Sequence, residues 1–266
     1  MTDRRTRTLS PAPEDNRKLA QRVSKCYTNA VPVFHLSEDI AFPSPALADE
    51  TGLLAVGGDL SVERLLLAYS MGIFPWYNRG EPILWWSPPE RAVVTPSEVH
   101  LPRSLKKALK KTPMRVRIDT CFAEVIKHCA KTPRPGQRGT WITADMREAY
   151  LELHAKGVAH SFETFEDDML VGGLYGVSLG GSFFGESMFS HKDDASKVAF
   201  VELARVLTAW SFDMIDCQLP NSNVMRYGTK VVPRKLFLEL LALSVKKPTK
   251  VGKWTSASTE ASPTEA

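Results

Sequence analysis

Cysteine and histidine are too few and too scattered in this 266-residue sequence to suggest a metal centre. The four cysteines form no CxxC pair, and the six histidines form no cluster near them. This pattern argues against a structural zinc site and predicts that no metal is bound. Reduced thiols, as in a cytosolic protein, are the expected state.

Long hydrophobic runs are also missing. No apolar run approaches the roughly 20 residues that a membrane-spanning helix needs. The first residues lack the apolar core of a secretory signal, and Asp3, Glu14 and Asp15 argue against a transit peptide. The sequence therefore predicts a soluble, cytoplasmic protein.

The net charge is low for a nucleic-acid-binding protein, since the sequence has 34 Lys and Arg and 30 Asp and Glu, which gives a formal net charge of +4. The distribution, however, is uneven. Residues 101–138 hold eleven basic and two acidic side chains, whereas residues 31–100 and 139–245 are both acidic overall. The basic segment predicts a surface for a polyanion, and a solvated basic helix face is the alternative.

Composition divides the chain into four parts. Residues 1–30 and 246–266 are polar and rich in Ser, Thr, Pro and charge, so we expect both to be disordered. Residues 31–91, dense in turns and aromatics, are predicted to form a small N-terminal α/β domain. Residues 92–245 are predicted to form a larger domain.

Periodicity and capping residues predict the elements of both domains. Ser61 can cap a helix that Gly72 ends, Asp119 can cap another, and Pro233 can open the last helix at its first position. Further helices are expected over 103–111, before Gly157 and over 195–210, and strands over 91–95, 114–118, 160–165, 170–177, 182–189 and 214–218. This order indicates the α+β class and resembles an acetyltransferase-like (GNAT-like) domain behind a smaller one.

Three polar residues stand out in apolar surroundings. Asp216 and Gln218, two apart on a predicted strand, are expected to point to one face. They could form a reactive pair or a buried hydrogen-bonded pair that only fixes the fold. Glu186 is the only charged residue between Asp168 and His191. It could lie on the surface, or in a cleft where it recognises a cationic ligand.

A glycine-rich diphosphate cradle is absent from residues 190–195, where acyl-coenzyme A enzymes of the acetyltransferase fold carry one. An acyltransferase with this sequence is therefore expected to use another acyl donor. Tryptophans are core residues by default, but Trp76 lies in a Gly/Pro-framed loop and Trp141 just ahead of a helix. Both could offer a stacking platform for a base.

A series of motifs from residue 40 to 241 resembles the bacterial leucyl/phenylalanyl-tRNA–protein transferase family. These motifs are FPSP at 42–45, GLLAVGGDL at 52–60, GIFPW at 72–76, ILWWSP at 83–88, GTWIT at 139–143, GGLYG at 172–176, GESMFS at 185–190, ASK at 195–197 and IDCQ at 215–218. The resemblance implies that an aminoacyl-tRNA donates Leu, Phe or, less readily, Met to the α-amine of a protein beginning with Arg or Lys. The extended protein would then be degraded by the N-degron (N-end rule) route. No cofactor is implied, and a monomer is the default.

The chemistry of the residues, the charge distribution and the resemblance together predict roles for individual residues. Asp216 would orient the acceptor amine and help to deprotonate it, and Gln218 would position the reacting groups. Glu186 would lie at the mouth of the site and recognise the cationic side chain of the acceptor. Trp76 and Trp141 would hold the terminal adenosine of the donor. The expected pocket for the donor side chain is lined by Leu174, Phe183, Met188, Phe200 and Leu203. The expected phosphate contacts are Arg103, Lys106, Lys107, Lys110 and Lys111.

One position departs from the family pattern. Asn223 stands where the family usually has a histidine, and an amide cannot titrate near neutral pH. Two rival functions stay open from sequence alone. One is a different acyltransferase of the same fold, using coenzyme A or building a cell-wall peptide. The other is a non-catalytic RNA-binding module built on the basic segment.

Overall fold

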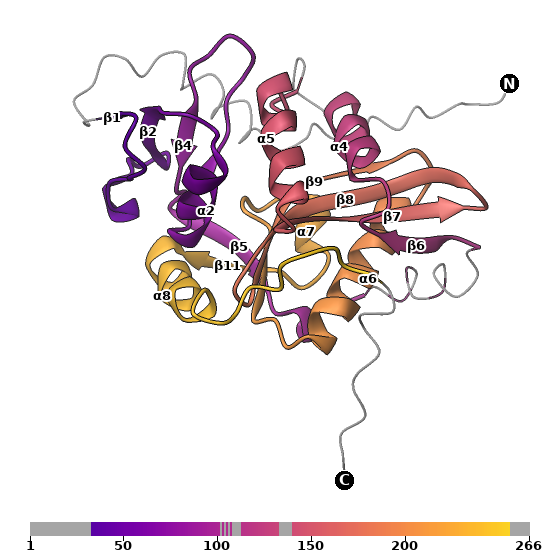
Figure 1. Ribbon diagram of the computed structural model, residues 1–266. Helices are drawn as coiled ribbons and strands as arrows, with labels where there is room; N and C mark the ends of the chain where they lie inside the picture. The colour runs from indigo at the N-terminus through magenta and orange to yellow at the C-terminus, as the bar shows by residue number, and fades with distance from the viewer. Residues whose placement is uncertain are drawn as a thin grey trace, which may run out of the picture.

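The computed structural model describes residues 33–101, 103, 105, 107, 113–132 and 140–255 of the chain. These residues form two β-sheets with helices packed against them (Figure 1). The predicted α+β class is confirmed, whereas the acetyltransferase-like topology stays a prediction. The leader at 1–30 lies outside the described residues, as does much of the basic segment.

The smaller sheet has four strands in the order β1-β2-β4-β3. Its strands are β1 (Phe34–Leu36), β2 (Leu53–Gly57), β3 (Phe74–Pro75) and β4 (Leu84–Trp86), and the 3₁₀-helix η2 (Pro45–Leu47) precedes β2. Helix α2 (Val62–Ser70) lies between β2 and β3 and begins as predicted, because the Ser61 side chain accepts a hydrogen bond from the Arg64 amide.

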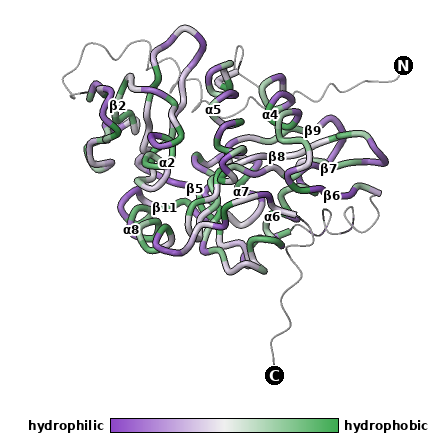
Figure 2. The backbone as a smooth tube through the Cα atoms, viewed as in Figure 1, coloured by the Kyte–Doolittle hydropathy of each residue, from purple (hydrophilic) through white to green (hydrophobic). Residues whose placement is uncertain are grey.

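The larger sheet has seven strands in the order β11-β5-β10-β9-β8-β7-β6. All neighbouring strands are antiparallel except β10 and β9. The strands are β5 (Glu90–Val94), β6 (Arg115–Ile118), β7 (Ala159–Glu166), β8 (Met169–Leu179), β9 (Ser182–Ser190), β10 (Met214–Asp216) and β11 (Lys230–Pro233). The predicted meander β7-β8-β9 is confirmed, and its β7–β8 turn is hydrophilic (Figure 2).

Helices cover both faces of the larger sheet (Figure 1). Helices α4 (Phe122–Lys131) and α5 (Ala144–Ala155) pack on one face, and their core continues into the small sheet. We call this cluster the α4/α5-side core. Helix α6 (Ala195–Ala209) packs on the other face over a second cluster, the α6-side core. The remaining elements are η3 (Pro96–Glu98), α7 (Ser222–Met225) and α8 (Arg234–Ser244).

Three expectations about local structure are wrong. Asp119 does not cap α4, which begins after Cys121; its carboxylate instead accepts from the Ser161 and Trp254 amides. Pro233 ends strand β11, which the sequence did not predict, and caps α8 instead of opening it. The predicted disordered tail is ordered over residues 246–255, where Trp254 is 3% exposed.

Within the described ranges, no helix is both long and apolar enough to span a membrane. In the same part of the chain, no three His, Cys, Asp or Glu side chains gather as a metal-binding group would require.

Candidate active site

Asp216 is the last residue of β10 and forms a buried ion pair with Arg91 of the neighbouring strand β5. Arg91 Nε donates to both carboxylate oxygens at 2.9 and 3.0 Å, and Nη2 donates to Oδ2 at 2.6 Å. The two side chains are 0% and 1% exposed. Such bidentate, charge-assisted pairing occupies the carboxylate, which leaves it poorly placed to take a proton from a substrate amine.

Arg91 is itself enclosed by groups from the small sheet and from α8. Its guanidinium carbon lies 4.7 Å from the ring centroid of Phe74 and 4.6 Å from that of Phe237. Its Nη1 donates to the Gly72 carbonyl at 3.3 Å. Gly72 has φ 73°, and a Cβ there would lie 2.8 Å from the Phe237 ring, so only glycine allows this close approach.

Gln218 does not share a strand face with Asp216, because β10 ends at Asp216 and Gln218 has φ 60°. The two are joined through the backbone instead, since the Gln218 amide donates to Asp216 Oδ1 at 2.8 Å. The Gln218 side chain donates from Nε2 to Glu186 Oε1 at 2.9 Å. Asp216 therefore fixes the turn from which Gln218 reaches Glu186.

Glu186 is the extra residue of a β-bulge in β9. Tyr175 pairs with Ser187 and Gly176 pairs with Gly185, which leaves Glu186 without a partner on β8. A bulge turns a side chain out of the regular alternation and is common next to active sites.

Two tyrosines complete the cluster around the Glu186 carboxyl. The Tyr69 hydroxyl of α2 donates to Oε1 at 2.7 Å, and the Tyr150 hydroxyl of α5 donates to Oε2 at 2.9 Å. Burial raises the pKa of Glu186 to about 7, although the tyrosine hydrogen bonds act in the opposite direction. Burial, followed by the charge of Glu186, raises the pKa of both tyrosines well above 10.

Sequence reasoning missed Arg91, Tyr69 and Tyr150. Tyr69 reads as an apolar position of a predicted helix, and Arg91 reads as the exposed start of a strand. The only signal that could have pointed to a partner for Asp216 was the high cost of burying an isolated carboxylate.

The expected pocket residues lie together on the other face of the larger sheet. Leu174, Phe183, Phe200 and Leu203 are all buried in the α6-side core, and Met188 packs against it. Strand β9 carries both groups, with Phe183 and Met188 facing α6 and Glu186 facing α5. The structure thus brings the five residues together in one cluster. This cluster and the carboxyl group of Glu186 lie on opposite faces of strand β9.

Trp76 and Trp141 are half-buried, whereas Trp85 and Trp86 are fully buried core residues. The Tyr77 hydroxyl lies 3.3 Å from Thr143 Oγ1, which joins the loop of Trp76 to the segment that carries Trp141. The two half-buried tryptophans therefore lie in adjoining segments.

The remaining predicted residues lie on the surface where the structure describes them. Arg103 and Lys107 are helical and exposed, and Lys106, Lys110 and Lys111 lie outside the described residues. Asn223 is exposed in α7, and its Oδ1 accepts from Arg226 at 3.3 Å. An open cavity of about 390 Å³ contains none of the predicted site residues; it lies between α2 and α5 and is lined by Leu60, Ser61, Ile83, Asp145, Glu148, Ala149 and Glu152.

Comparison with known proteins gives a consistent result for most of the chain. Residues 93–242 match the family model of leucyl/phenylalanyl-tRNA protein transferase, and residues 58–89 match the model of that family's N-terminal domain. A leucyl/phenylalanyl-tRNA–protein transferase of Anaeromyxobacter sp. (strain K) is 53% identical over 224 residues, covering 84% of this chain and 96% of that protein. One from Myxococcus xanthus (strain DK1622) is 52% identical over 227 residues, covering 85% and 97%.

Among solved structures, L-PGS from Bacillus licheniformis aligns with a TM-score of 0.36 and 11% identity, over 64% of this chain and 53% of that one. So weak a likeness supports no conclusion about the fold. The sequence matches, by contrast, extend through the strands and helices that carry Glu186, Asp216 and Gln218. The chain belongs to the leucyl/phenylalanyl-tRNA–protein transferase family of aminoacyltransferase enzymes.

Proposed function

We propose that this protein transfers Leu, Phe and, less readily, Met from aminoacyl-tRNA to the N-terminal α-amine of proteins that begin with Arg or Lys, which marks them for N-degron degradation. One observation carries the proposal. Gln218 is held between the buried carboxyl group of Asp216, through its backbone, and the half-buried carboxyl group of Glu186, through its side chain. The matching relatives are named for transfer from leucyl-tRNA or phenylalanyl-tRNA to protein.

The chemistry requires positioning more than activation. The aminoacyl ester of tRNA is already reactive, so attack by an amine needs close approach and support for the developing oxyanion. Because Gln218 Nε2 donates to Glu186, its Oε1 faces away from that carboxyl and can accept a hydrogen bond from the acceptor amine. We therefore assign Gln218 the role of positioning the acceptor amine next to the aminoacyl ester.

Asp216 and Glu186 act through Gln218 in this proposal. The burial of Asp216 and its pairing with Arg91 favour a positioning role over removal of the amine proton. Glu186 holds the amide of Gln218, and its charge, when ionised, attracts the cationic side chain of the acceptor's N-terminal Arg or Lys. A pKa of about 7 makes that charge sensitive to pH near neutrality.

The donor would be held at three places. Its terminal adenosine would stack on Trp76 and Trp141, whose loops adjoin. Its side chain would enter among the α6-side residues around Phe183 and Met188, where selection rests on shape. Its phosphates would meet the exposed basic side chains of the 103–111 segment.

The test is transfer of label from ³H-leucyl-tRNA to a peptide that begins with Arg, without coenzyme A. The expected product is the peptide extended by one leucine, and an Arg peptide with an acetylated α-amine serves as the matched control. Gln218→Leu should abolish transfer while tRNA binding persists. RNA binding without any transfer by the unmodified protein would overturn the proposal and favour an RNA-binding module, and transfer only in the presence of coenzyme A would favour another acyltransferase.

A further inference from the structure

The segment after α8, residues 246–255, crosses one end of the larger sheet; we call it the C-terminal strap. Lys247 Nζ donates to Asp213 Oδ1 at 2.6 Å, just before β10. The Gly180 amide, in the β8–β9 turn, donates to Thr249 Oγ1 at 2.9 Å. The Gly252 amide donates to the Gly157 carbonyl at 3.0 Å, beyond the end of α5. The strap is therefore attached along its length.

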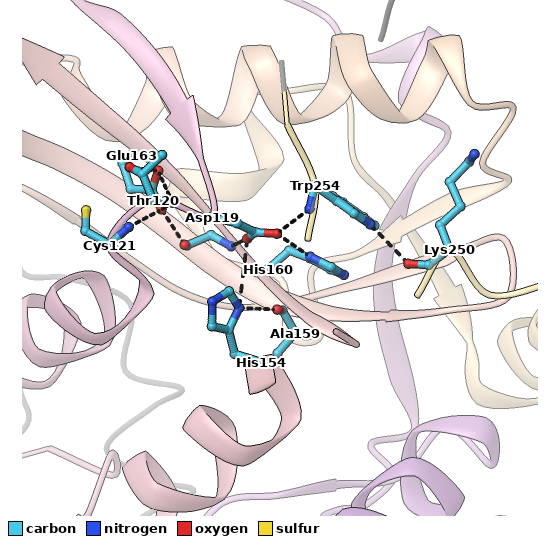
Figure 3. Close-up of polar contacts among 10 residues, drawn as sticks. Asp119, Thr120, Cys121, His154, Ala159, His160, Glu163, Lys250 and Trp254 are labelled. Carbon is cyan, nitrogen blue, oxygen red and sulfur yellow. Dashed lines mark hydrogen bonds and ion pairs between the residues drawn. The ribbon is translucent and has the colours of Figure 1, made fainter. Parts of the chain in front are cut away.

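The strap places Trp254 in the α6-side core. Figure 3 shows its hydrogen bonds to Asp119 and Lys250. The indole stacks on the His160 ring, with centroids 3.6 Å apart and planes 9° apart. Its backbone amide donates to Asp119 Oδ2 at 2.8 Å, and its Nε1 donates to the Lys250 carbonyl at 3.1 Å. These contacts fix both the position and the orientation of the indole.

Two buried titratable residues, Asp119 and His160, hold Trp254 in place. His160 Nδ1 lies 2.8 Å from the same Asp119 oxygen that accepts from Trp254, and both side chains are 0% exposed. Asp119 also has φ 54°, an unusual backbone conformation for a residue with a side chain. Neither residue belongs to the Glu186 cluster. Their shared contact holds Trp254 and the start of the α4 segment together.

Trp254 in turn contacts Phe183, one of the proposed pocket residues. Their ring centroids are 6.2 Å apart. Phe183 is also confined by strand β8, since a Cβ built on Gly176 would lie 2.6 Å from Phe183 Cε1. The Phe183 ring therefore lies directly against the backbone of β8, and Trp254 limits where else it can go.

We propose that Trp254 is a positioning residue for donor selection, which sets the place of the Phe183 ring and so the depth of the pocket for the donor side chain. The inference rests on the proposed function, because it assumes that Phe183 lines that pocket. Removing the indole leaves a space that Phe183 can enter, because a core relaxes toward a cavity. The pocket then becomes deeper, and the larger phenylalanyl donor gains relative to the leucyl donor.

The experiment measures kcat/KM for leucyl-tRNA and phenylalanyl-tRNA with one Arg-starting peptide. For Trp254→Ala we expect the Leu/Phe ratio to fall by about threefold or more, mainly through the KM values of the two donors. Trp254→Phe keeps an aromatic ring against Phe183 and should restore the ratio. Trp210→Ala is the matched control, because Trp210 packs 4.8 Å from Trp254 but belongs to the end of α6.

The results distinguish failure of the Trp254 role from failure of the proposed function. A folded Trp254→Ala with the unmodified ratio, or an equal shift in Trp210→Ala, overturns the positioning role. If Trp254→Ala fails to fold, Trp254→Leu keeps an apolar side chain in place, and its ratio decides in the same way. An unmodified protein that transfers neither amino acid overturns the proposed function, and with it this inference.

Discussion

Removing the carboxylate of Asp216 is expected to destabilise the protein as well as to stop transfer. Asp216→Ala removes the carboxylate that pairs with the Arg91 guanidinium, which is 1% exposed and otherwise lies near the Gly72 carbonyl at 3.3 Å and two aromatic rings. Breaking one side of a buried ion pair costs about 3–5 kcal/mol, a large part of the about 5–15 kcal/mol that stabilises a typical domain. The ion pair therefore links loss of activity at Asp216 to loss of stability.

The double variant Arg91→Met with Asp216→Leu separates stability from catalysis. Two apolar side chains replace the charges, so most of the lost unfolding free energy should return. Transfer should not return, because the Gln218 amide loses the Asp216 oxygen that fixes it at 2.8 Å. An active double variant would show that Asp216 does not act by positioning Gln218.

Urea unfolding, followed by circular dichroism, measures the effect on stability, and labelled-leucine transfer measures activity. Glu98→Ala is the control, because it breaks an exposed ion pair with Lys230, whose side chains are 54% and 68% exposed, and should leave stability unchanged. A loss of less than about 1 kcal/mol in Asp216→Ala would refute the reasoning, since that is the range of a surface pair.

Three further outcomes are expected. Since the pKa of Glu186 is raised to about 7, the folded state binds the Glu186 proton more tightly than the unfolded chain does. The unfolding free energy should therefore fall as pH rises from 4.5 through 7, by about 1–2 kcal/mol for this partly buried group. Glu186→Gln should make the unfolding free energy, measured by urea titration, less dependent on pH over that range. Tyr69→Phe removes a hydrogen-bond donor to the Glu186 carboxylate, which should raise the pKa of Glu186 and shift the pH–rate profile of transfer to higher pH. Tyr77→Phe should leave the profile unchanged. Replacing Arg103 and Lys107 together by Ala should make the plot of log binding constant for tRNA against log salt concentration less steep, by about 2. An unchanged slope would show that this segment is a solvated helix face without phosphate contacts.

Local signals were enough to predict most of the elements. Ser61 accepts a hydrogen bond from an amide in the first turn of the helix that follows, as its place ahead of that helix predicts. The meander followed from alternating apolar residues and two tight turns. Asp119 misled the same reasoning, because its carboxylate is occupied by groups 41, 42 and 135 residues away.

The site was only half predictable for a similar reason. A carboxylate and an amide at the end of an apolar strand identify Asp216 and Gln218 by the cost of burying them. Their partners are distant in sequence: Arg91 lies 125 residues from Asp216, and Tyr69 lies 117 residues from Glu186. Glu186 also depends on a bulge, and no residue pattern in β9 marks where the register shifts.

The distant partners show why the small sheet is part of the site. Tyr69 from α2 donates to Glu186, and Gly72, just after that helix, accepts from Arg91. Residues of the small sheet and of α4 and α5 also share one continuous core. Because hydrogen bonds from both regions hold the two carboxyl groups on which Gln218 depends, a shift of one sheet relative to the other would displace the Gln218 amide. If Gln218 acts as proposed, the N-terminal region of this chain is part of the scaffold that positions it, and the arrangement of the two sheets sets where its amide lies.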